Sequence, residues 1–145
     1  MSGFCPGHFE VERLNREEIQ HIAAKYDLQN LTIGVLGSHS AVELGLSAKT
    51  LGAKTVVIVE EGREALYLKD YGHLYDHSIK VKRFRDLLND KVQDKLLRLN
   101  TVFVPNRSFS VYVGYDGIEN YFRVPIYGNR SLLRAEDRKD ERGQY

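Results

Sequence analysis

A strand-length apolar run that passes within four residues into a helical pattern most constrains what this chain can fold into. Residues 31–36 form the run, Gly37–Ser40 form a small turn, and apolar residues then recur at helical spacing over residues 41–48. A strand that leads directly into a helix is the first half of a parallel crossover unit. The stretch therefore predicts the first strand and helix of an α/β fold.

The turn in this stretch, Gly-Ser-His-Ser, places small polar residues at the start of the predicted helix. Free backbone N–H groups and the helix dipole both favour an anion at that position. Gly37 allows a ligand to approach the backbone, and the hydroxyls of Ser38 and Ser40 can cap the helix or bind an oxygen ligand. His39 lies where ligands bind in open α/β sheets. A phosphate or carboxylate site is one interpretation, and an ordinary strand-to-helix turn is the other.

Three more strand-length runs and two helical patterns complete the predicted architecture. The strands are expected at residues 56–59, 77–81 and 101–104, and the helices at residues 15–27 and 83–99. The longer helical pattern contains a break at Asn89 and Asp90. This order predicts a doubly wound α/β fold with a mainly parallel sheet.

The ends of the chain differ in character from its middle. We expect a loosely ordered arm over residues 1–14, one domain over residues 15–136, and a charged, solvated tail over residues 137–145. Within the domain, residues 110–114 fit either a helix or a strand, and residues 117–120 are expected to form a turn. A length of 145 residues is consistent with one core.

A second turn, Pro105-Asn106-Arg107-Ser108-Phe109, follows the last predicted strand. Carboxyl ends of parallel strands lie at the same edge of a sheet, so this turn should face the turn at residues 37–40 across one crevice. Ser108 and His39 are therefore expected to converge there.

Composition excludes several classes of partner and fold. Lys and Arg number 21 against 20 for Asp and Glu, which argues against nucleic-acid binding. Cys5 is the only cysteine, so no intrachain disulfide and no thiolate metal cluster are expected. No run of about 18 apolar residues indicates a membrane span. We expect a cytoplasmic protein without a membrane anchor.

Other chemical patterns are weaker. The glycines at positions 34 and 37 are followed by Ser40, so the dinucleotide fingerprint lacks its third glycine, and no Walker loop occurs. A hydrolase built on Ser38 or Ser108 with His39 lacks the G-x-S-x-G elbow. Arg63, just past the second strand, is either an anion contact or a solvated loop residue.

A metal site is a further alternative that the pattern does not favour. His73, Asp76 and His77 have a spacing that would bring two imidazoles together on a helix. Gly72 and the absence of an apolar period argue against a helix in this segment. No metal site is therefore predicted.

Four motifs in combination carry a family resemblance. They are LGSH, VP-x-x-SF, G-x-x-x-I-E-N-x-F-x-V-P and GNR, spread over residues 36–130. Together with the surrounding sequence, from about residue 17 to residue 136, they resemble the N-terminal domain of the archaeal formate-dependent ligase that makes FAICAR from AICAR in purine (IMP) biosynthesis.

The resemblance implies a fold, a reaction and a site. The family belongs to the ATP-grasp superfamily, in which formate would become formyl phosphate and the amine of AICAR would attack it. The domain would be a Rossmann-like pre-ATP-grasp domain that helps to bind AICAR, with the family's binding histidine and serine at His39 and Ser108. A role of His39 as a general base is a hypothesis that rests on its ordinary pKa of about 6.5.

The resemblance also implies cofactors and partners for the complete enzyme. ATP and Mg²⁺ would bind mainly in the grasp domain that follows this domain in the family. We expect another chain to supply that domain or this chain to lack it. This chain alone should therefore not complete the reaction. Formate would be the second substrate. Whether the chain forms a homo-oligomer is left open. The alternative is a stand-alone purine-nucleotide-binding or regulatory module without catalysis, and a third is a remnant that binds nothing.

The sequence departs from the family pattern in the second turn. Asn106 and Arg107 stand where the family usually has His-Gly, and Ala135 stands where it has Trp. Arg107 either adds a phosphate contact or fills the site.

Overall fold

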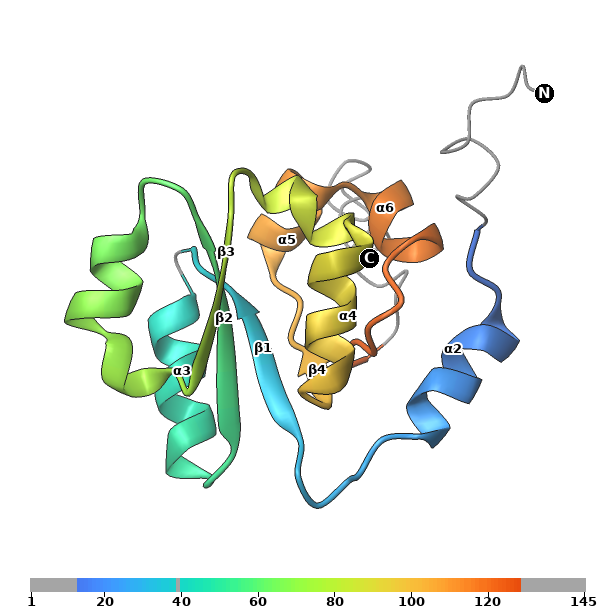
Figure 1. Cartoon of the computed structure of the whole chain (residues 1–145), viewed down its shortest axis with the longest axis horizontal. Helices are drawn as coiled ribbons and strands as arrows, with labels where there is room; N and C mark the ends of the chain where they lie inside the picture. Colours follow the sequence, from blue (N-terminus) through green and yellow to red (C-terminus); the bar gives the residue numbers. More distant parts are fainter. Residues whose placement is uncertain (1–12, 39, 129–145) are drawn as a thin grey trace, which may run out of the picture.

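A computed structural model describes residues 13–38 and 40–128 of the chain. Its centre is a four-stranded, entirely parallel sheet in the order β3-β2-β1-β4 (Figure 1). The strands are β1 (Thr32–Leu36), β2 (Lys54–Glu60), β3 (His77–Val81) and β4 (Thr101–Phe103). A parallel bridge between Phe103 and Ile126 continues the sheet beyond β4. The predicted α/β fold with a parallel sheet is confirmed.

Helices cover both faces of this sheet (Figure 1). The α-helices are α2 (Arg16–Ala24), α3 (Ala41–Thr50), α4 (Asp90–Arg98), α5 (Arg107–Val113) and α6 (Tyr115–Asn120). Three shorter turns are the π-helical η1 (Ala65–Asp70) and the 3₁₀-helical η2 (Gly72–Leu74) and η3 (Phe84–Leu88). The elements α3 and η1 pack on one face, and α4, α5, α6 and η3 pack on the other.

The central strands are buried on both faces, so alternate side chains enter two separate cores. Val35, Val57 and Val59 contact Ala41 and Tyr67 on the face of α3 and η1. The intervening residues Leu36, Val56 and Ile58 enter the larger core on the other face. Continuous β-branched runs are typical of strands in this position.

Three phenylalanines anchor the larger core. Phe103 of β4 lies 4.8 Å from Phe109 and 5.5 Å from Phe122, measured between ring centroids. Phe109 and Phe122 are 5.4 Å apart with nearly perpendicular rings, a favourable aromatic geometry. This cluster ties β4 to the helix that follows it.

Local sequence features set several element ends as predicted. The Asn15 side chain accepts a hydrogen bond of 2.8 Å from the Glu18 N–H and caps α2. Gly52, with φ of 80°, ends α3 in the left-handed conformation that glycine favours. Asn89 separates η3 from α4, so the predicted break in the long helical pattern is confirmed.

Two predictions after residue 105 are wrong. Residues 117–120 form the end of α6 rather than a turn, and α5 begins at Arg107, inside the segment expected to be a turn. Tertiary burial explains both short helices, because Ile118 and Phe109 are buried and Gly117 packs against Leu88. Helices of this length are not stable on their own in water.

Parts of the expected arm and tail lie outside the described residues. These are residues 1–12, with most of the arm, and residues 129–145, with part of the GNR motif and the whole predicted tail. The Leu14 N–H donates a 2.6 Å hydrogen bond to the Asn120 carbonyl, which attaches the segment before α2 to the end of α6. None of the described helices is long and apolar enough to span a membrane.

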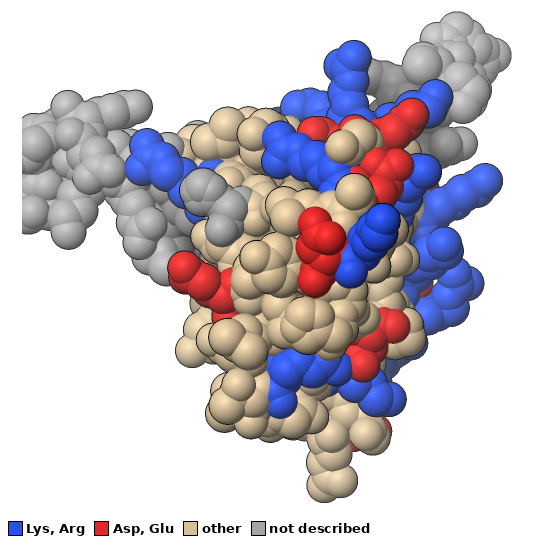
Figure 2. All heavy atoms as spheres, turned by 90° about the vertical axis from the view of Figure 1, so that its left-hand side faces the viewer, with Lys and Arg blue, Asp and Glu red and all other residues tan. Residues whose placement is uncertain are grey.

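Charge is mixed on the face that presents α3 and η1. Figure 2 shows acidic and basic side chains interspersed over the centre of this face, and Lys and Arg gathered along its right-hand border. The near balance of the whole chain therefore conceals local differences in charge.

Gly34 in β1 gives the first test of this architecture. A Cβ atom there would lie 2.6 Å from Thr101 Cγ2 and 2.9 Å from Phe103 Cδ1. We expect Gly34→Ala to lower the free energy of unfolding by about 1–3 kcal/mol, because β1 and β4 would be forced apart. Urea denaturation measures the change. Gly72→Ala is the control, since nothing lies within 4 Å of that position, and an equal loss in both variants would contradict the packing.

Asp76 gives a second test, through acid stability. Its carboxylate accepts hydrogen bonds from the Thr55 N–H at 2.8 Å and from Lys49 Nζ. Desolvation raises the pKa of Asp76, but the contacts with Lys49 and Thr55 outweigh it and hold the pKa below its ordinary value. This stabilisation is present above the unfolded-state pKa of about 3.9 and is lost as the pH falls through the lower folded-state value.

We therefore expect Asp76→Asn to reduce the loss of stability on acidification. Urea midpoints measured from pH 6 down to pH 3 should fall less steeply for the variant than for the unaltered protein. Asp70→Asn is the control, because Asp70 is exposed and accepts no hydrogen bond from the described residues. Parallel pH profiles for Asp76→Asn and the unaltered protein would contradict the assignment.

Candidate functional site

The carboxyl ends of β1 and β4 meet at the point where the strand order reverses. The chain proceeds from β1 through β2 to β3 on one side, whereas β4 pairs with β1 on the other side. The helices that follow β1 and β4 pack on opposite faces of the sheet, so their connecting loops diverge. Ligands bind in such a crevice in open α/β sheets. We call the loop residues 37, 38, 40, 41 and 104–108, where this rule places a ligand, the switch-point crevice.

Gly37 holds the β1 side of this crevice close to β2. Its N–H donates a 2.7 Å hydrogen bond to the Ile58 carbonyl, which extends the pairing beyond β1. A Cβ atom at this position would lie 2.7 Å from the same carbonyl oxygen. Only glycine allows this approach, so the predicted anion turn begins with a tight backbone contact.

Ser38 is buried, and its backbone and side chain are used differently. Its carbonyl accepts hydrogen bonds from the Tyr67 hydroxyl at 2.9 Å and from the Ala41 N–H at 3.0 Å. Its hydroxyl Oγ is shielded from solvent and has no hydrogen-bond partner among the residues that the structure describes. A buried hydroxyl without a partner costs about 1–3 kcal/mol, which a polar ligand would recover.

Asn106 supplies a similar group from the β4 side. Its Oδ1 accepts a 3.0 Å hydrogen bond from the Phe109 N–H and caps α5. Its Nδ2 is shielded from solvent and has no hydrogen-bond partner within residues 13–38 and 40–128. The register pairs Gly34 with Phe103, so Gly37 and Asn106 each lie three residues beyond the last paired positions of adjacent strands. Two unsatisfied polar groups therefore lie on neighbouring loops.

The other predicted site residues differ in their positions and burial. Ser40 occupies the N-cap position of α3, but its side chain makes no capping hydrogen bond. Ser108 is half-buried in the first turn of α5, and Arg107 is exposed. His39 lies outside the described residues, so its convergence with Ser108 stays a prediction.

Asn106 was not among the predicted binding residues. Its position before α5 makes it the cap of that helix, which accounts for Oδ1 but leaves the amide nitrogen unassigned. The sequence does not show that the amide nitrogen of this capping residue is buried, so its availability to a ligand can be recognised only from the structure. The departure from the family pattern at this position was the one feature of the sequence that drew attention to it.

Arg63 lies past β2 and is occupied by neighbours of its own. Its guanidinium lies 5.6 Å from the Phe84 ring centroid, and its Nε lies 3.7 Å from Glu60 Oε1. Glu60 offsets its charge, so an anion contact there stays a hypothesis.

The His73, Asp76 and His77 segment is not helical as a whole. His73 lies in η2 and His77 begins β3, while Asp76 binds Thr55 and Lys49. Among the described residues, no group of three His, Cys, Asp or Glu side chains could hold a metal ion.

Tyr67 supports the crevice from the π-helical turn η1. Burial raises the pKa of its hydroxyl, an effect that the charge of Arg63 partly offsets, so the group stays protonated and donates to Ser38. The buried ring also lies 3.4 Å from the position that a Cβ atom on Gly37 would occupy. Tyr67 therefore fixes the backbone of the turn at Ser38.

We expect Tyr67→Phe to loosen the turn at residues 37–41 without unfolding the protein. Losing one hydrogen bond to the Ser38 carbonyl should cost about 1 kcal/mol. Amide hydrogen exchange should accelerate at Ala41, whose N–H bonds the same carbonyl. Tyr71→Phe, which removes a hydroxyl without a partner among the described residues, is the control. Unchanged exchange at Ala41 would contradict this role.

Known proteins share this fold and much of this sequence. A family described as "Protein of unknown function (DUF1246)" matches residues 33–145. A 5-formaminoimidazole-4-carboxamide-1-(beta)-D-ribofuranosyl 5'-monophosphate synthetase of Methanopyrus kandleri is 48% identical over 126 residues, which are 87% of this chain and 34% of that protein. The synthetase of the same name from Methanothermobacter thermautotrophicus is 42% identical over 130 residues, 90% of this chain and 35% of that protein.

A solved structure gives the same relationship. The IMP biosynthesis protein PurP from Thermococcus kodakaraensis matches with a TM-score of 0.58 and 28% identity, over 72% of this chain and 32% of that one. The chain thus spans about a third of the length of these relatives. Because the family match takes in most of the chain, this protein belongs to the DUF1246 family and is a homologue of the FAICAR synthetases, as its motifs indicated.

Proposed function

We propose that this chain binds AICAR in the switch-point crevice, as the substrate-binding domain of a formate-dependent ligase that converts AICAR to FAICAR in purine biosynthesis. The observation that carries the proposal is a pair of buried groups, Ser38 Oγ and Asn106 Nδ2, which lie on the loops after adjacent strands and have no partner in the described part of the chain. The family relationship supplies the identity of the ligand.

The chemistry of the crevice suits this nucleotide. The names of the relatives describe a ribose 5'-monophosphate of an imidazole carboxamide, which presents phosphate, hydroxyl and amide groups. Asn106 Nδ2 donates only and suits a phosphate or carbonyl oxygen, whereas Ser38 Oγ both donates and accepts. The start of α3 adds backbone N–H groups and a positive helix end for an anion. His39 and Ser108 complete the set by resemblance to the family.

The chemical step belongs to the complete enzyme. ATP would activate formate as formyl phosphate with Mg²⁺ bound, and the amine of AICAR would attack the formyl carbon and displace phosphate. The described residues offer no three-residue metal cluster, so no Mg²⁺ site is assigned to them. The part that we propose for this chain is to bind and orient AICAR.

A non-catalytic module that binds the same nucleotide is the second candidate. It would use the same crevice without ATP or formate. Adding formate, ATP and a separately produced ATP-grasp chain distinguishes the two, because only the ligase component would then form FAICAR.

Calorimetric titration with AICAR tests the shared proposal. We expect saturable binding that weakens about tenfold in Ser38→Ala and in Asn106→Ala, since each removes one hydrogen bond to a polar ligand. His39→Ala and Ser108→Ala should also weaken binding. Ser47→Ala is the control, because Ser47 is exposed on α3 outside the crevice.

Two outcomes would overturn the proposal. One is no heat of binding at millimolar AICAR with a correctly folded protein, as judged by its circular dichroism spectrum. The other is equal affinity of the unaltered protein and all four crevice variants, which would place AICAR elsewhere.

A further inference from the structure

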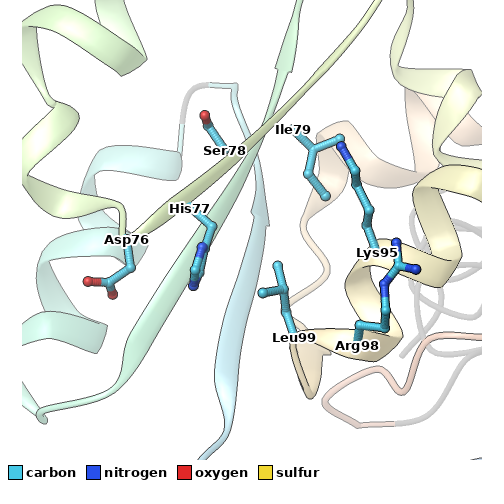
Figure 3. A pocket seen from close by; sticks show the side chains of 7 residues that line it. All are labelled: Asp76, His77, Ser78, Ile79, Lys95, Arg98 and Leu99. Atoms are coloured by element: carbon cyan, nitrogen blue, oxygen red, sulfur yellow. The ribbon is translucent and has the colours of Figure 1, made fainter.

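The amino edge of the sheet, opposite the switch-point crevice, contains a hollow between β3 and α4 (Figure 3). Its volume is about 450 Å³, within the range of small-molecule sites. His77, Ser78 and Ile79 of β3 line one side, and Lys95, Arg98 and Leu99 at the end of α4 line the other. We call this hollow the β3–α4 pocket.

The cations of the β3–α4 pocket are not neutralised by its own residues. Lys95 and Arg98 are exposed and form no ion pair within the described part of the chain. Asp76, the carboxylate that also lines the pocket, is paired with Lys49. The pocket therefore has an excess of positive charge.

The end of α4 offers a competing explanation for these cations. Lysine and arginine in a last turn stabilise the helix dipole, which places about half a negative charge at that end. Two cations exceed this half charge. A second hollow of about 470 Å³ shares His77, Arg98 and Leu99 and adds Lys54 from the start of β2, which the end of α4 does not explain.

The floor of the β3–α4 pocket is apolar. Ile79 is 6% exposed and Leu99 is half-buried, and both line the pocket. A ligand that fits both features joins an anionic group to a carbon skeleton or ring.

Fixed backbone frames the adjoining hollow. Asn100 has φ of 61°, and its side chain donates to the carbonyls of Asp27 and Asn30 at 2.6 and 3.1 Å and accepts from the Asp27 N–H at 3.0 Å. On the other side, Asp76 binds the start of β2 through Thr55. A preformed wall lowers the ordering cost of binding.

We propose that the β3–α4 pocket is a second ligand site, which takes a small organic phosphate. Lys95 and Arg98 bind the phosphate, and Ile79 and Leu99 contact its organic part. The site is independent of the proposed AICAR crevice. Thr32 lines the adjoining hollow, and Ser38 lies six residues further along the direction of β1, roughly 20 Å away at the rise of a strand.

Phenyl phosphate is the probe for this site, followed by two-dimensional NMR of the full chain at fixed ionic strength. We expect saturable amide shifts at residues 77–79 and 95–99. Lys95→Gln and Arg98→Gln should each weaken binding about tenfold, because each removes a charge-assisted hydrogen bond. Inorganic phosphate should bind more weakly than phenyl phosphate, since it lacks the part that contacts Ile79 and Leu99.

Matched controls separate this site from general charge and from the crevice. Lys91→Gln removes a charge from an exposed position of the same helix and should bind like the unaltered protein. Ser38→Ala should also leave the shifts at residues 77–79 and 95–99 unchanged. Three outcomes would overturn the proposal: equal weakening of binding by Lys91→Gln, the absence of a saturable shift, or shifts confined to residues 37–41 and 104–108. The last outcome would still support binding at the crevice.

Discussion

The parallel pairing of β1 with β4 is the constraint on which the rest of the structure depends. Three residue pairs join the strands, and the Val104 N–H continues the ladder with a 2.9 Å hydrogen bond to the Gly34 carbonyl. Below them, the Thr32 hydroxyl donates a 2.7 Å hydrogen bond to the Leu99 carbonyl. The pairing is close because Gly34 has no side chain to separate the strands. It joins two halves whose helices cover opposite faces, so the loops after β1 and β4 must diverge at one edge. The crevice is thus a consequence of the strand order, before any side chain in it is considered.

The polar groups in that crevice oppose the stability of the fold. Ser38 Oγ and Asn106 Nδ2 each forgo hydrogen bonds that water would provide, at about 1–3 kcal/mol for a buried group. Alanine at position 38 would remove this buried hydroxyl with little loss of side-chain volume. Stability alone therefore does not explain the serine. Asn106 differs, because its Oδ1 is required as the cap of α5 and brings the free amide nitrogen with it. The Ser38 hydroxyl is therefore the stronger indication of a ligand. Asn106 is weaker evidence, because its role as the cap of α5 already explains its presence.

Periodicity in the sequence predicted the elements that are amphipathic or continuously apolar, and β3 appears at its predicted bounds. It failed where burial rather than pattern determines the structure. The helix α6 contains a glycine and would be unstable alone, but Gly117 fits against Leu88 and Ile118 enters the core. The π-helical turn η1 showed no regular period, yet it places Tyr67 beneath Ser38. At the site, the turn at residues 37–40 was recognisable from its residue types. The second role of Asn106 was not, because sequence shows which groups can bond and not which ones lack a partner.

The two edges of the sheet favour anions by different physical means. At the carboxyl edge, α3 directs backbone N–H groups and a positive helix end at the crevice, and the hydroxyl and amide groups there are neutral. At the amino edge, α4 ends with its negative pole, so attraction must come from side-chain cations such as Lys95 and Arg98. Exposed charges are screened within about 8 Å at physiological ionic strength, whereas buried hydrogen bonds are screened much less. Salt should therefore weaken binding at the β3–α4 pocket far more than at the crevice. That difference follows from the direction in which every helix of a parallel sheet must run.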